Sequence, residues 1–266
     1  MEKYKNEKYL KKEIMEQSRH QLIYGYCGDT RSQFLQELDE EYPLLEDSTT
    51  PIALYMDNFG LPKVENQRNQ TDGYIVGAIS REYLSMSIAS KILEKTLEKQ
   101  NKELEERLNR LLYLINKLNR HSQVEVSSLR ELLQALEEAK QFYLTNFSQY
   151  LTGTIDEISI NQLSVPFLQL DMFISEFKRA MNIQSYFGIL LDKKEPVALS
   201  SAQAVNNIIG RRINKDISIK LAVEPNDWDT YFDPNGQRIE VIHDYGTVEL
   251  DDSHKEYIKT LIKNNE

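Results

Sequence analysis

The chain has 266 residues, of which 40% are hydrophobic and 28% charged, an ordinary composition for a globular protein. Its formal net charge of −10 argues against a surface that coats nucleic acid, so nucleic acid would be contacted only through partners or a local basic patch. One cysteine and four scattered histidines indicate neither an internal disulfide nor a zinc site. The polar N-terminus and the absence of any apolar run of ~20 residues predict a cytoplasmic protein without a membrane span.

The N-terminal part predicts a βαβ unit. Residues 1–20 predict a charged helix, and residues 21–27 predict a short apolar strand that ends in a glycine-bearing turn. A second helix follows up to Pro43, and residues 50–56 predict a second strand. Because a helix separates the two strands, we expect them to lie parallel in one sheet.

The middle of the chain is helical in pattern. After a polar loop, one long helix is predicted from about residue 73 to 120, because leucine and isoleucine recur at steps of three, four or seven. Residues 124–151 supply an antiparallel partner. Two interpretations stay open, namely a projecting coiled-coil-like hairpin and a helical layer lying on the sheet. The hairpin interpretation divides the chain into three parts. Residues 1–80 form the first part of the α/β core, residues 81–152 form the helical insertion, and residues 153–266 form the second part of the core.

The C-terminal part again alternates helices and strands. The predicted helices cover 166–182, 200–212 and a short stretch near 257–262, and the predicted strands cover 186–192, 217–223 and 239–242. Residues 155–165 alternate as a strand would, although a loop is equally compatible. This order predicts an α/β fold. We expect a P-loop NTPase-like sheet that is mainly parallel and flanked by helices, with the long helical hairpin as an insertion.

The turn after the first strand resembles a phosphate-binding loop. Gly25 to Ser32 nearly fits the pattern G-x-x-x-x-G-K-[ST], and the strand–turn–helix context is the required one. Thr30 replaces the second glycine and Arg31 replaces the lysine. If the loop kept the usual backbone, a β-branched Thr30 would stand where a positive φ is needed. An ordinary βα turn is the alternative.

A second element raises the expectation of a nucleotide site. The apolar strand 186–192 ends in Asp192, where a carboxylate would support Mg²⁺. Hydrolysis of ATP also needs an acid directly after it to polarise the attacking water, but Lys193 and Lys194 follow. We therefore assign no catalytic residue.

Together, the Gly25–Ser32 turn, the strand ending at Asp192, the helix 201–212 and the strand 217–225 resemble bacterial AAA+-type P-loop ATPases. More narrowly, they resemble those related to the origin-recognition class, over most of residues 20–60 and 165–255. The resemblance implies ATP and Mg²⁺ as ligands and homo- or hetero-oligomeric assembly with protein partners. It implies a nucleotide site built from Gly25, Gly28, Asp29, Thr30, Arg31, Ser32 and Gln33.

By motif position, Ser32 and Asp192 would hold the metal. Arg211 and Arg212 would be arginine fingers that reach the nucleotide of a neighbouring subunit. The alternative is that they are surface residues at the end of a helix. The departures at Thr30, Arg31 and Lys193 favour a degenerate subunit that binds partners, with weak or no ATP hydrolysis. A defence system against mobile DNA is a setting that this type of ATPase suggests. Two alternatives remain, an active ATP-hydrolysing motor or switch and a ligand-free helical adaptor.

Overall fold

The computed structural model describes residues 7–25, 28–44, 47–61, 73–99, 102–118, 126–156, 170–194, 197–210, 215–224, 228, 232–233, 236–240 and 244–251. Within them, helices and strands alternate in the following order: α1 (Glu7–Met15), β1 (His20–Tyr24), α2 (Gly28–Glu41), β2 (Ile52–Met56), α3 (Gly73–Glu98), α4 (Lys102–Leu118), α5 (Leu129–Leu151), α6 (Leu170–Met181), β3 (Phe187–Asp192), α7 (Leu199–Gly210), β4 (Ile217–Val223) and β5 (Tyr245–Glu249). None of the helices in these ranges is long and apolar enough to cross a membrane.

The five strands form one sheet in the order β2-β3-β4-β1-β5, and every neighbouring pair is parallel. All residues of β3 and β4 are buried, because helices cover both faces of the central strands. This explains why β3 reads as a nearly continuous apolar run in the sequence, whereas β4 alternates and buries Ser218 and Lys220 as well. The predicted parallel α/β sheet is confirmed.

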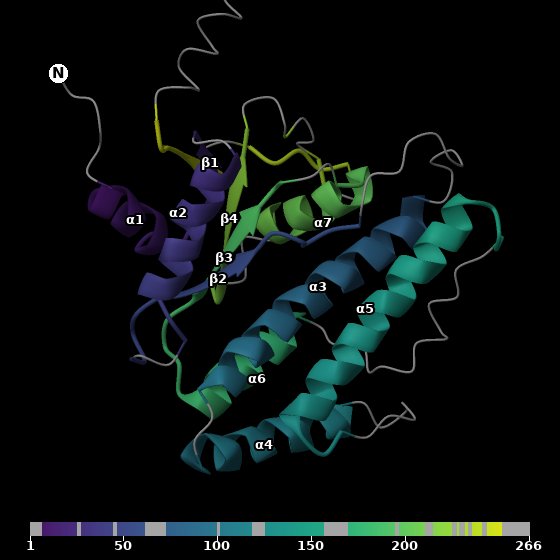
Figure 1. Cartoon of the computed structure of the whole chain (residues 1–266), viewed down its shortest axis with the longest axis horizontal. Coiled ribbons are helices and arrows are strands. Elements are labelled where there is room, and N and C mark those ends of the chain that lie inside the picture. Colours follow the sequence, from purple (N-terminus) through teal and green to yellow (C-terminus); the bar gives the residue numbers. More distant parts are fainter. Residues whose placement is uncertain are drawn as a thin grey trace, which may run out of the picture.

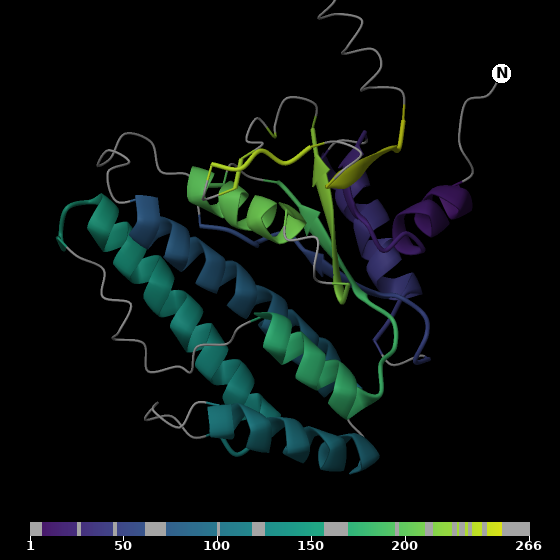
Figure 2. The same ribbon diagram turned by 180° about the vertical axis from the view of Figure 1, so that it is seen from behind.

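One face of the sheet carries α1 and α2, as Figures 1 and 2 show. Apolar residues of both helices pack with one set of strand residues, which includes Ile23, Leu190 and Ala222. The amino group of Lys11 joins the two helices, with Glu37 at 2.9 Å and Glu41 at 2.6 Å. The predicted N-terminal helix is therefore part of the core layer, although it covers only residues 7–15 of the described chain.

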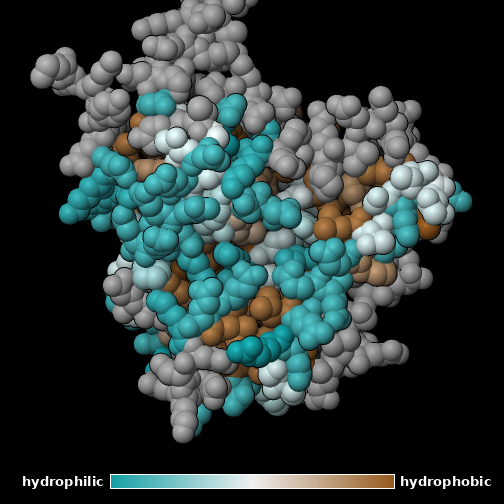
Figure 3. Space-filling model, viewed as in Figure 1, coloured by the Kyte–Doolittle hydropathy of each residue, from teal (hydrophilic) through white to brown (hydrophobic). Residues whose placement is uncertain are grey.

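The other face carries the remaining helices (Figure 1). α3 packs against α5, α6 and α7, and α4 packs against α6. A single apolar cluster runs from the strand residues Leu54, Ile189 and Leu221 through α3 to α5. In the middle region α3 contacts the sheet, α5 packs against α3 and α4 packs against α6, and their buried residues belong to one core cluster. This packing favours the helical layer over a projecting hairpin. Hydrophilic residues cover most of the face in Figure 3, and the hydrophobic residues that reach its surface lie chiefly over this helical layer.

The long helix predicted from 73 to 120 is instead two helices, α3 and α4. α3 ends at Glu98, and the backbone N–H of Lys99 closes a short turn onto Thr96. The leucine repeat could not show this break, because it does not tell which elements each half packs against. α3 packs against α5, α6 and α7, whereas α4 packs against α6. α5 lies beside α3 (Figures 1 and 2), so the predicted pairing of 124–151 is with the first half of the repeat.

The C-terminal strand was predicted at the wrong place. Of the strand predicted at 239–242, residues 239 and 240 are not in a strand, and residues 241–242 lie outside the described residues. β5 spans Tyr245–Glu249 and pairs with β1. β5 is a short edge strand that contains Gly246 and the polar residues Thr247 and Glu249, which gives it a weak strand pattern. The predicted segments 157–165 and 257–262 lie outside the described residues.

Candidate nucleotide-loop site

In the described part of the turn between β1 and α2, both glycines lie in the left-handed region. Gly25 has φ +99° and Gly28 has φ +52°, and glycine adopts these values without the steric penalty of a side chain. α2 begins at Gly28, so the helix starts two residues before the position of the second glycine in the phosphate-loop pattern. The loop therefore differs in backbone from the one that the pattern describes.

Thr30 consequently lies inside the first turn of α2. Among the described non-glycine residues only Asn182 has a positive φ, so Thr30 carries none of the strain that the motif comparison predicted. Asp29 and Thr30 are exposed, and so is Gln33, whose amide points along the helix to Glu37 at 3.2 Å.

Gly25 is also required by its neighbour across the sheet edge. A Cβ at this position would lie 2.7 Å from Oδ1 and 2.8 Å from the backbone nitrogen of Asp251. The N–H of Leu250 donates to the carbonyl of Tyr24 at 2.8 Å, which holds the end of β5 against the turn. The first glycine of the motif is thus explained by packing as well as by any role toward a phosphate.

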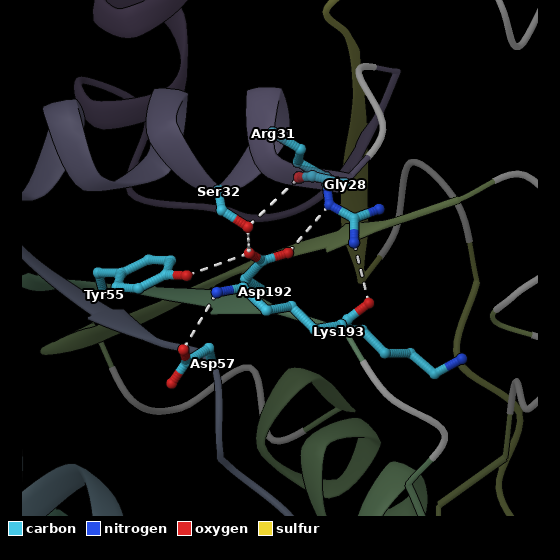
Figure 4. A network of polar contacts seen from close by, with 8 residues as sticks. Gly28, Arg31, Ser32, Tyr55, Asp57, Asp192 and Lys193 are labelled. Carbon is cyan, nitrogen blue, oxygen red and sulfur yellow. Dashed lines mark hydrogen bonds and ion pairs between the residues drawn. The ribbon is translucent and has the colours of Figure 1, made fainter.

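The carboxylate of Asp192 is the centre of a buried polar network (Figure 4). The residue has no exposed surface, while Arg31 is 2% and Ser32 is 6% exposed. Nε of Arg31 donates to Oδ1 at 2.9 Å, and the hydroxyl of Ser32 donates to Oδ2 at 2.5 Å. The Ser32 oxygen also lies 3.4 Å from the carbonyl of Gly28, but its one proton is used in the much shorter bond. The two motifs predicted from the sequence therefore meet directly.

Tyr55 is a member of this network that the sequence did not indicate. Its hydroxyl donates to Oδ2 of Asp192 at 3.1 Å from the neighbouring strand β2. The register explains the meeting, because Tyr55 pairs with Leu190, and Asp192 points to the same face two residues later. A tyrosine near the carboxyl end of a buried strand was the available signal, since polar groups converge at that edge of a parallel sheet.

The register also explains how Arg31 reaches Asp192 across β4. Asp192 pairs with Ala222, and Ala222 pairs with Ile23 of β1, so all three side chains face α2. The small side chain of Ala222 leaves room beneath the first turns of α2. A one-residue slip of β3 would turn the carboxylate to the opposite face.

Two lysines follow the carboxylate. The carbonyl of Lys193 accepts a hydrogen bond from Nη2 of Arg31 at 2.9 Å, and the Lys193 side chain extends away from Asp192 (Figure 4). The amino group of Lys194 lies 3.2 Å from Asp57 and 5.8 Å from the centre of the Tyr55 ring. Hydrogen bonding to Tyr55, followed by that to Asp57, raises the pKa of Lys194 to about 12. Both residues strengthen the positive charge at this end of β3.

The geometry can be tested against Mg²⁺. One carboxylate oxygen of Asp192 is engaged by Arg31, and the other by Ser32 and Tyr55. A divalent cation about 5 Å from the guanidinium would be repelled by roughly 6 kcal/mol at an effective dielectric constant of about 20. The arrangement of these residues therefore does not fit Mg²⁺ at Asp192. No group of three or more His, Cys, Asp or Glu side chains elsewhere in the described ranges could hold a metal ion.

The predicted arginine fingers, Arg211 and Arg212, lie outside the described residues. Of the other predicted site residues, Arg31, Ser32 and Asp192 come together. Gly25 and Gly28 shape the turn, and Asp29, Thr30 and Gln33 face outward.

Comparison with known proteins assigns the chain to a family. The model of one protein family, described as ORC-CDC6-like, matches residues 11–264. No curated protein matches the chain.

Proposed function

Because the chain belongs to the ORC-CDC6-like family of AAA+ P-loop ATPase-like proteins, we propose that it is a degenerate member with weak or no ATP hydrolysis. In this proposal it acts by binding protein partners in a larger assembly. The family makes nucleotide and Mg²⁺ plausible ligands. The observation that carries the proposal is the engagement of both Asp192 oxygens by Arg31, Ser32 and Tyr55.

The residue after Asp192 supports the loss of hydrolysis. An attacking water needs a base beside the terminal phosphate, and a protonated lysine cannot serve as one. Lys193 occupies this position, and it is held by its backbone to Ala222 and Arg31. A carboxylate at another position would have to replace it in an active enzyme.

The use of Arg31 supports the same conclusion. The P-loop lysine neutralises phosphate oxygens as a compact point charge. Here the guanidinium forms an ion pair with Asp192 and a hydrogen bond to the carbonyl of Lys193, so two of its three nitrogens face the protein. The positive charge that should meet a nucleotide is largely used within the fold.

Hydrolysis is tested by phosphate release from the purified chain in ATP and Mg²⁺, alone and with any co-purified partner. We expect release at the background rate. Release that the variant Asp192→Asn abolishes, with its fold verified by circular dichroism, would contradict the proposal. A thermal shift in ATP tests binding separately, since a ligand at 100 times its Kd adds about 2.7 kcal/mol of stability.

We propose that the helical layer is the partner-binding region, with α4 as its exposed part. Leu108, Leu111 and Ile115 of α4 are buried, whereas Tyr113 on the opposite side is 64% exposed. Exposed aromatic side chains are frequent anchors of protein interfaces. Deletion of the region is not a usable test, because α3 and α5 contribute to the main core.

The test of this region is a substitution that leaves the core intact. Tyr113→Ser should reduce the amount of partner that co-purifies from the native host. The matched control is Tyr9→Ser on α1, at a side chain that is 59% exposed. Equal recovery of partner with both variants would contradict a role for α4.

A defence system against mobile DNA is the setting that we propose from the type of ATPase alone. Host cells with and without the gene should then differ in plaque number after phage challenge. Equal plaque numbers across a broad phage panel would count against this setting, without bearing on the ATPase test.

A further inference from the structure

The charge balance around Asp192 is complete without an added ion. Its carboxylate is fully buried and forms an ion pair with the Arg31 guanidinium, whose side chain is 3% exposed. An uncompensated buried carboxylate would be strongly unfavourable, so some cation is required at this point. In the structure that cation is a side chain of α2.

Three side-chain donors hold the Asp192 carboxylate in one orientation. The Ser32 hydroxyl and the Tyr55 hydroxyl both donate to Oδ2, and Nε of Arg31 donates to Oδ1. Nη2 of Arg31 is bonded in turn to the carbonyl of Lys193, so the guanidinium is held at two points (Figure 4). These two contacts fix the positive charge of the guanidinium beside the carboxylate.

We infer that Arg31 is a built-in replacement for the divalent cation, and that the Asp192 site works without one. The inference rests on the proposed function in taking Gly25–Ser32 as a changed phosphate loop. It goes further in stating that no Mg²⁺ binds at Asp192. Asp192 serves as a structural anchor for α2, and any nucleotide bound at this loop is bound independently of Mg²⁺.

The geometry also shows which donor of the Arg31 guanidinium is left unused. Nη1 of Arg31 is buried and has no hydrogen-bond partner in the described part of the chain. It lies at the first turn of the 14-residue helix α2. An unpartnered donor here favours a negative charge over a metal cation beside Arg31.

The inference is tested by removing the Arg31 guanidinium and asking whether an added divalent cation can take its place beside Asp192. Arg31→Ala leaves Asp192 unpaired, and we expect the Tm to fall by roughly 10 °C. Millimolar MnCl₂ should recover a substantial part of this loss in Arg31→Ala, but should not stabilise the wild type. The control is the double variant Arg31→Ala/Asp192→Asn, which has no carboxylate to bind the ion and should not respond. No recovery in Arg31→Ala would overturn the inference.

A second measurement does not depend on the folding of Arg31→Ala. The electron paramagnetic resonance signal of free Mn²⁺ should fall equally on addition of the wild type and Asp192→Asn, with or without ADP. Binding of one Mn²⁺ to the wild type that Asp192→Asn removes would overturn the inference, as would an ADP-induced Tm shift that requires Mg²⁺. A chain that binds Mn²⁺ at Asp192 yet releases no phosphate would refute this inference alone. A chain that hydrolyses ATP would refute the proposed function.

Discussion

The hydroxyl of Tyr55 donates a hydrogen bond to Oδ2 of Asp192 at 3.1 Å, which joins β2 to β3 at their carboxyl ends. The same oxygen accepts the Ser32 hydroxyl from α2 at 2.5 Å. The consecutive elements α2 and β2 thus share one carboxylate with β3, which is distant from both in the sequence. This arrangement gives the site a structural role whether or not it binds a nucleotide.

Tyr55→Phe removes one donor from the buried carboxylate and leaves the ring in place. We expect the free energy of unfolding to fall by about 1–2 kcal/mol, because hydrogen bonds to charged groups contribute more than neutral ones. Urea denaturation measures the change. Tyr113→Phe removes a hydroxyl from an exposed tyrosine and should change stability by less than about 0.5 kcal/mol. Equal effects of both variants would show that the bond to Asp192 contributes nothing.

The two glycines of the turn should respond differently to alanine. At Gly28 a Cβ would meet no atom within 4 Å, so Gly28→Ala should lose only about 1 kcal/mol through its φ of +52°. At Gly25 the new Cβ would collide with Asp251, in addition to the strain of φ +99°. Gly25→Ala should therefore be the more destabilising of the two by thermal denaturation. A larger loss for Gly28→Ala would indicate that the end of β5 yields easily.

His20 should make the stability depend on pH. Its Nδ1 accepts the N–H of Ile219 at 2.9 Å, and burial, with a smaller contribution from Lys220, lowers its pKa from 6.5 to about 4. The unfolded chain therefore binds the proton more readily. The stabilisation is complete above pH 6.5 and is lost as the pH falls toward 4, by on the order of 3 kcal/mol.

The variant His20→Asn keeps an acceptor for Ile219 but cannot titrate. Chemical denaturation between pH 4 and 7 should show a shallower loss of stability in this variant than in the wild type. Parallel curves would mean that His20 is protonated in the folded protein at its ordinary pKa.

Glu82 on α3 should have the opposite effect. Burial raises its pKa to about 7, against the opposing charge of Arg81. The folded chain therefore holds the proton more tightly than the unfolded chain, and stability falls as the pH rises from about 4.5 through 7. Glu82→Gln should stabilise the protein at pH 8 by on the order of 1–3 kcal/mol and leave it unchanged at pH 4.5. The exposed Glu98→Gln on the same helix is the control.

Much of the sheet could be predicted because its signals are local. The apolar run that ends at Asp192 and the alternating run from Ile217 to Val223 required only the periodicity of neighbouring residues. The glycine-bearing turn and the helix after it were visible for the same reason. β5 was misplaced because its strand pattern is weak and its pairing with β1 is made across the whole chain.

The break between α3 and α4 shows a different limit. A leucine repeat indicates that one side of a helix is buried, but it does not indicate which other element covers that side. α3 packs against the sheet, α5, α6 and α7, whereas α4 packs against α6, and the chain turns between the two helices. Only the tertiary packing determines that the helices form a layer on the sheet.

The sequence by itself determined that Arg31, Ser32 and Asp192 stand at the motif positions of a P-loop protein, and that Lys193 follows. Such positions depend only on residue order along a strand, a turn and a helix. The tertiary structure decided that Arg31 turns to Asp192, that Tyr55 joins them and that α2 begins at Gly28. The physical reason is that a buried carboxylate takes the cation and the donors that the strand register brings to its face, and that register is a property of the whole sheet.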